Sequence, residues 1–164
     1  GAGSILRRTQ TGAVGNYAGQ TVGMGFLSDS VYSATGTTGV HLTTAWSVAA
    51  GFEHLWTSAL RTSLYGSYAA FSYNSAATTL LCGAVVGCNP NFSMWSLGSR
   101  TQWEPVRGLI MGVDVMYQQL NTLKPDSTGS VVLAANGAKA AGTYTVSDQH
   151  QWYGTFRIQR DWVP

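Results

Sequence analysis

Residues 60–70 read LRTSLYGSYAA, and bulky apolar side chains alternate along them with polar ones. Leu60 and Leu64 fall on one side of an extended chain, whereas Arg61 and Ser63 fall on the other. Successive side chains of a β-strand point to opposite faces, so an alternation with a period of two predicts a strand with one apolar and one polar face.

The same alternation recurs in several other segments. It predicts five strands in all, at residues 40–55, 59–73, 92–103, 109–121 and 149–162. Short turns at residues 56–58 and 104–108 separate some of these strands, and long loops at residues 74–91 and 122–147 separate the others. Before residue 40 the pattern is weaker: it suggests one more strand at residues 17–27 and a loop at residues 29–39.

Composition points away from a water-soluble domain. Only 10% of the residues are charged, compared with roughly 25% in ordinary soluble proteins. No stretch reaches the roughly 20 apolar residues that a membrane helix requires. Strands of about a dozen residues fit a bilayer, and alternating short and long connections are typical of outer-membrane barrels. We therefore predict an all-β fold, a transmembrane antiparallel β-barrel, with an ordinary β-sandwich as the alternative.

Five charged side chains within the strands share the polar face of the alternation. On a face turned to lipid, an arginine near the bilayer midplane would cost roughly 2–4 kcal/mol, whereas a water-filled lumen removes that cost. The sequence thus predicts that the following residues line a pore: Glu53, Arg61, Arg100, Asp114 and Arg157. Tryptophans gather near the strand ends, as in the aromatic belts at membrane surfaces, at Trp46, Trp56, Trp95, Trp103, Trp152 and Trp162.

Other functional classes find little support. The net charge of +2 is small and its basic residues are scattered, so no nucleic-acid partner is expected. His41, His54 and His150 lie far apart and no nucleophile motif accompanies them, so we predict no enzyme, no metal site and no cofactor. Cys82 and Cys88 predict a small disulfide-closed loop, with two free thiols as the alternative.

Several motifs in residues 40–164 resemble the alphaproteobacterial porin family of rhizobial and related bacteria. These motifs are LTTAW at 42–46, GFEHLW at 51–56, LRTSLYGSY at 60–68, CNPNF at 88–92, LGSRTQW at 97–103, GVDV at 112–115 and FRIQR at 156–160. The motifs occur in the same order as in the family, which makes the resemblance specific.

The resemblance implies an outer-membrane porin of about sixteen strands, usually a homotrimer surrounded by outer-membrane lipid. Such a protein is a channel for passive diffusion of small hydrophilic solutes and ions in the bacterial outer membrane. We treat residues 1–164 as one barrel segment, with strand and loop at 1–39 and the C-terminal barrel strands at 40–164.

The length of the chain leaves three arrangements open, because five to eight strands are too few for a sixteen-stranded barrel. The chain is a piece of a longer porin, which we prefer, or it closes a small eight-stranded barrel with a structural or adhesive role, or several copies share one barrel. A secreted β-sandwich that binds a partner is the alternative from another class.

Overall fold

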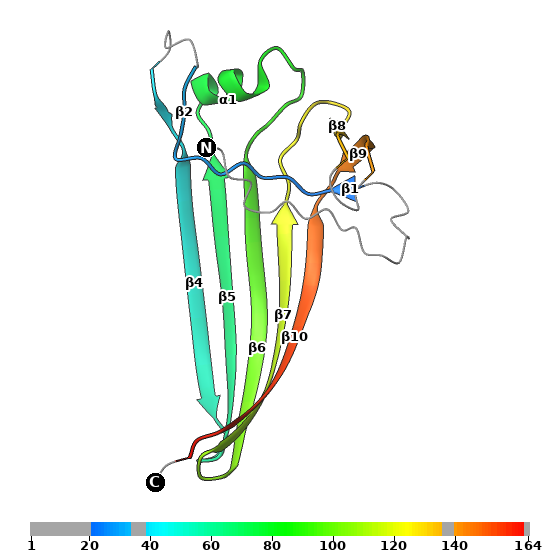
Figure 1. The fold of residues 1–164 in the computed structure, drawn as a ribbon. Helices are drawn as coiled ribbons and strands as arrows, with labels where there is room; N and C mark the ends of the chain where they lie inside the picture. The colour runs from blue at the N-terminus through cyan, green and yellow to red at the C-terminus, as the bar shows by residue number, and fades with distance from the viewer. Residues whose placement is uncertain (1–20, 34–38, 136–139, 163–164) are drawn as a thin grey trace. The chain divides into compact units, whose positions relative to one another are not determined.

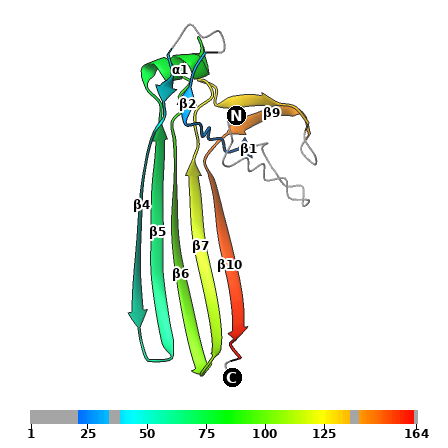
Figure 2. The same ribbon diagram turned by 60° about the vertical axis from the view of Figure 1, so that its left-hand side comes forward.

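The computed structural model describes residues 21–33, 39–135 and 140–162, and it consists mainly of β-strands (Figure 1). Its largest sheet has five strands in the order β10–β7–β6–β5–β4, so strands that follow one another along the chain lie side by side (Figure 2). Their bounds are Thr44–Leu55 for β4, Leu60–Ser72 for β5, Phe92–Val106 for β6, Leu109–Asn121 for β7 and Gln149–Arg160 for β10. The prediction of an all-β fold with five long strands is confirmed.

The long strands have 12 to 15 residues, about twice the usual length in globular sheets. The turn that we predicted at residues 104–108 is shorter than expected, because β6 continues through Pro105 to Val106. The turn itself is Arg107–Gly108, where Gly108 adopts a left-handed φ of 78° that other residues rarely adopt. The Glu104 carboxylate accepts the backbone N–H of Gly108 at 2.9 Å, which closes the turn.

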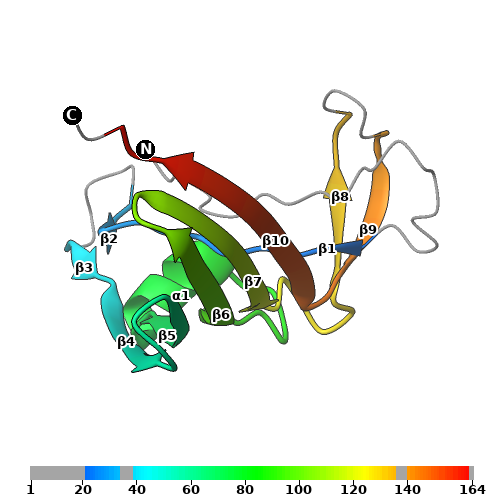
Figure 3. The ribbon, with the colours of Figure 1, turned by 90° about the horizontal axis from the view of Figure 1, so that it is seen from below.

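The chain divides into two compact units. One comprises residues 1–46, 70–93 and 120–149, and the other comprises residues 47–69, 94–119 and 150–164. The second unit contains most of each long strand, and these strands form a single layer (Figure 3). Among the described residues, every buried hydrophobic side chain belongs to the first unit. The single-layered unit therefore has no hydrophobic core of its own in the described part of the chain.

Two small clusters form the core of the first unit. One contains Val31, Tyr73 and Ala77, with Leu80 packed against them. The other contains Phe92, Leu120 and Leu123, with Met24 and Phe71 at its edge, and the rings of Phe71 and Phe92 stack at 4.6 Å between centroids.

Both long loops contain regular structure that the sequence analysis missed. Within residues 74–91, Ser75–Cys82 form helix α1, and the Asn74 side chain caps it by accepting the N–H of Ala77 at 2.8 Å. Within residues 122–147, strands β8 (Ser130–Leu133) and β9 (Gly142–Val146) pair antiparallel. In the described part of the chain, no helix is long and apolar enough to span a membrane.

The segment before residue 40 differs from the expected strand and loop. Strand β1 covers only Thr21–Val22 and pairs parallel with β9, whereas residues 17–20 lie outside the described part. Strand β2 (Ser30–Val31) pairs antiparallel with β3 (His41–Leu42), which is separate from β4. The expected strand at 17–27 was wrong beyond Val22, because residues 24 and 26 bond to distant loops rather than to a neighbouring strand.

Candidate functional site

Side-chain hydrogen bonds between neighbouring strands define a polar face on the five-stranded sheet. Arg61 on β5 donates from Nε to Oε1 of Gln102 on β6 at 3.1 Å. Ser63 on β5 donates to Glu53 on β4 at 2.9 Å. Gln151 on β10 donates to Gln118 on β7 at 2.9 Å, so all five strands contribute to this polar face.

One bond on the polar face passes over a whole strand. The Tyr65 hydroxyl on β5 donates to a carboxylate oxygen of Asp114 on β7, although β6 lies between them. The ring passes over Gly98 of β6, where an added Cβ would lie only 2.5 Å from the ring carbon that bears the hydroxyl. Any side chain at residue 98 would therefore displace the end of the Tyr65 ring from this position.

A recess of about 210 Å³ lies on the same face, over the first half of β7. Three of the five residues that we predicted to line a pore meet here, namely Arg100, Asp114 and Arg157. The other residues that line it are Gln102, Ile110, Gly112, Thr155 and Gln159. The remaining two predicted residues, Arg61 and Glu53, lie outside the recess and bond to Gln102 and Ser63 on the polar face.

The two arginines of the recess differ in their partners. Arg157 donates from Nη2 to Gln159, and Gln159 in turn donates to Asp161 at 2.8 Å. The side chain of Arg100 makes no hydrogen bond to any residue that the structure describes. The guanidinium of Arg100 therefore keeps its donors available to water or to a ligand.

The opposite face of the sheet is apolar. Large side chains from each strand are exposed there, including Leu64 at 53% and Phe156 at 62%. A shallow hollow of about 430 Å³ lies among them, lined in part by Val48, Phe52 and Leu97. This apolar face is exposed in the structure, although its large side chains have little affinity for water.

Aromatic rings group at two levels of the apolar face. Toward one end, the ring of Tyr117 lies 5.2 Å from Trp95 and 5.0 Å from Trp152, which joins β6, β7 and β10. At the C-terminal end of β4, the ring of His54 packs edge-on against the ring of Trp56, with 4.3 Å between their centroids. Three of the six tryptophans that the sequence places near strand ends, Trp56, Trp95 and Trp152, belong to these packed groups.

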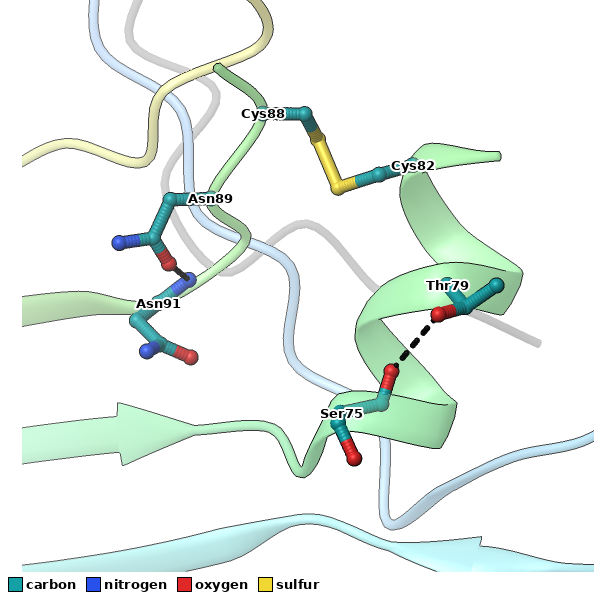
Figure 4. The surroundings of a disulfide bond; sticks show 6 residues. All are labelled: Ser75, Thr79, Cys82, Cys88, Asn89 and Asn91. Atoms are coloured by element: carbon teal, nitrogen blue, oxygen red, sulfur yellow. Dashed lines mark hydrogen bonds between the residues drawn. A yellow bond between two sulfur atoms is a disulfide. The ribbon is translucent and has the colours of Figure 1, made fainter. Parts of the chain in front are cut away.

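The predicted disulfide is present in the first unit. Cys82, the last residue of α1, bonds to Cys88, and their Cα atoms are 5.8 Å apart (Figure 4). Within the helix, Thr79 donates to the Ser75 carbonyl at 2.9 Å, and beyond the disulfide the Asn89 side chain accepts the N–H of Asn91 at 3.0 Å. The bridge therefore links the end of the helix to the chain that enters β6.

Residues 24–29 connect segments that lie far apart along the chain. Met24 exchanges bonds with the side chain of Thr122 at 2.7 and 2.9 Å. The Phe26 carbonyl accepts the Tyr73 hydroxyl, and the Asp29 carbonyl accepts the N–H of Thr43 at 3.1 Å. We call residues 24–29 the tether. The tether makes these contacts mostly through its own backbone atoms, so its side chains contained no signal for them.

Asp126 organises the turn that precedes β8. One of its carboxylate oxygens accepts the Thr128 hydroxyl at 2.7 Å and the N–H groups of Thr128 and Gly129 at 2.8 and 2.7 Å. The Thr128 hydroxyl, aided by backbone N–H groups of residues 128–130, holds the pKa of Asp126 below its usual range. The turn is thus tied to the ionised carboxylate.

Comparison with known families adds one finding. The model of a family described as "Porin subfamily" matches residues 9–156, which is most of the chain. No curated protein and no solved structure matches the chain.

Proposed function

Because this chain belongs to the porin subfamily and hence to the bacterial outer membrane, we propose that its sheet forms part of the wall of a water-filled channel. Small hydrophilic solutes and ions would cross the membrane through this channel by passive diffusion. The observation that carries the proposal is the contrast between the two faces of one single-layered sheet.

The polar face suits contact with water. Four of its charged side chains bond to serine, glutamine or tyrosine, namely Glu53, Arg61, Asp114 and Arg157, and they form no ion pair with one another. Among the described residues of this face, Glu53, Arg61 and Arg157 each have a neutral hydrogen-bond partner. Charges arranged in this way keep their fields directed into the neighbouring solvent, where they influence passing ions.

The apolar face suits contact with lipid. A soluble sheet with this many exposed large side chains would gain about 1.5–3 kcal/mol for each one that a second layer buried. Lipid tails provide the same apolar contact without a second protein layer. The shallow hollow near Phe52 and Leu97 has the apolar lining that an acyl chain would fill.

The spacing of the aromatics is close to the thickness of a membrane. Trp95 and Trp103 lie on the same face of β6, and the eight residues from one to the other correspond to about 26 Å of strand. A strand tilt of about 35–45° reduces this length to roughly 19–22 Å along the membrane normal. The apolar band of membrane barrels is about 25 Å tall and has aromatic rings at both borders. We therefore assign Trp95, with Tyr117 and Trp152, to one border and Trp103 to the other.

The outer strands require partners in the membrane. In the described part of the chain, β4 and β10 are the two edges of the five-stranded sheet. An open edge in lipid leaves backbone groups without hydrogen bonds, at a cost of several kcal/mol for each group. We propose that further strands of a longer polypeptide complete the wall, and that the complete barrels assemble as a homotrimer.

Two measurements on the native protein test this proposal. Reconstitution into a planar bilayer should produce discrete conductance steps, whereas the same sample denatured by boiling should produce none. An intact protein without conductance would overturn the channel function. The mass of the polypeptide isolated from the membrane, and of its cross-linked form, then checks the longer chain and the trimer.

A further inference from the structure

The recess over Gly112 has the chemistry of a binding site, which the role of a channel wall does not by itself require. We propose that it binds small oxyanions, such as inorganic phosphate, during their passage. This inference rests on the proposed function, because it assumes that the polar face meets water. It goes beyond that function by assigning a ligand class to one place on the wall.

The floor of the recess is open because residue 112 is glycine. A Cβ at this residue would meet its nearest atoms at 3.5 and 3.6 Å, which are ordinary van der Waals distances. Packing therefore does not require glycine at residue 112, in contrast to Gly98, which lies under the ring of Tyr65. The missing side chain leaves space between Arg100 and Arg157.

The walls of the recess offer mainly hydrogen-bond donors. The guanidinium group of Arg100 has no hydrogen-bond partner among the described residues, and that of Arg157 uses only one donor group, toward Gln159. Gln102 accepts from Arg61 through its oxygen, so its amide N–H groups are available to the recess. The planar fork of a guanidinium group matches two oxygens of a phosphate or a carboxylate.

Charge favours an anion over a cation. Two guanidinium groups face one carboxylate, so the recess has one excess positive charge. That carboxylate, Asp114, is already bonded to the Tyr65 hydroxyl. Asp114 also weakens the attraction of an anion to the two arginines, and weak binding allows the ligand to leave, as conduction requires.

The size of the recess fits a small ligand that keeps some of its water. Its volume of about 210 Å³ corresponds to roughly seven water molecules at about 30 Å³ each. The recess therefore has room for a small oxyanion together with part of its hydration shell. The cost of dehydration stays low for such a ligand.

The test measures how phosphate inhibits chloride current through the native protein in planar bilayers, at constant ionic strength. We expect saturable inhibition. Arg100→Gln and Arg157→Gln should each raise the half-inhibitory phosphate concentration about tenfold or more, since each removes a charged hydrogen bond. Gly112→Val should raise it similarly by filling the recess while it retains both arginines.

Arg107→Gln is the matched control, because it removes one positive charge from an exposed turn outside the recess. The half-inhibitory phosphate concentration of this variant should equal that of the wild type. Inhibition that does not saturate, or that changes equally in the control and the recess variants, overturns the oxyanion site. If the Gly112→Val variant does not insert into the membrane, Gly112→Ser provides the same test with a smaller side chain in the recess. A complete absence of chloride current would instead contradict the channel function.

Discussion

The phenol of Tyr65 reaches over Gly98 to donate a hydrogen bond to Asp114, so three neighbouring strands are joined by one side chain on the polar face. The contact fixes the position of the carboxylate beside Arg100, another residue of the recess. The position of the Tyr65 ring therefore depends on the absence of a side chain at residue 98, and double substitutions can measure this dependence.

Gly98→Ala should destabilise the protein by about 1–3 kcal/mol, because the new Cβ would overlap the Tyr65 ring. The cost should largely disappear in a Tyr65→Ala background, where no ring lies over residue 98. Gly112→Ala is the matched control and should change the stability by less than about 0.5 kcal/mol. Thermal unfolding in detergent measures all of these variants, and strictly additive effects of the two changes would contradict the proposed contact.

Arg100→Glu and Arg157→Glu should each shift the selectivity of the channel toward cations, because each change replaces a positive charge on the wall by a negative one. Asp114→Asn should shift it in the opposite direction. The reversal potential across a salt gradient reports these shifts. Arg107→Glu alters the net charge equally in an exposed turn and should have a smaller effect; identical shifts at all three arginines would remove any special role from the polar face.

Leu64→Arg and Ser63→Arg place the same side chain on opposite faces of β5. Near the middle of the membrane, an arginine turned to lipid should cost roughly 2–4 kcal/mol. At residue 63 the guanidinium group instead lies beside Glu53 and water, so the loss should be small. Folding yield and unfolding midpoint in detergent give the comparison. Equal losses for the two variants would show that the faces are not segregated as we propose.

Replacing both Cys82 and Cys88 by serine should loosen the end of α1 but leave the channel conductance unchanged. Closing so short a loop contributes about 2 kcal/mol by restricting the unfolded chain, and the effect should remain local to residues 75–91. Limited proteolysis should detect faster cleavage in this region. Lost conductance would instead indicate that the helix and its bridge support the wall.

The turn at Asp126 should open as the pH falls. Its pKa is lowered in the folded protein, so its stabilising effect is present above the usual carboxyl pKa of about 4 and is lost as the pH falls through the lowered value. The protection of the N–H groups of Thr128 and Gly129 from hydrogen exchange, relative to the intrinsic rate at each pH, should fall in that range. Asp126→Asn should lack this response, and a pH dependence that persists in the variant would implicate another group.

The long strands could be predicted from sequence because alternation is a local signal. The apolar and polar faces followed from the same pattern, since each strand reveals its own two sides. The match to the porin subfamily confirms that the chain belongs to a porin family, whereas the alphaproteobacterial origin that the motifs suggested stays a prediction. The roles of the five charged residues in conduction remain predictions, which the selectivity measurements above address.

The parts that were missed depend on contacts between distant segments or on short signals in polar surroundings. The bond from Tyr65 to Asp114 requires the relative alignment of β5, β6 and β7, which a single strand does not specify. The recess likewise depends on Gly112 lying between arginines of two other strands. Helix α1 did have a signal, because Asn74 precedes a run rich in alanine and leucine, but the cysteines and glycines nearby favoured a loop.

The tether has a consequence for the order of folding. Its bonds between Met24 and Thr122 join residues that are 98 apart in sequence. Closing so large a loop carries an entropic cost that is recovered only when both segments are already in place. The hairpins between adjacent strands should therefore assemble early, and the tether should close last.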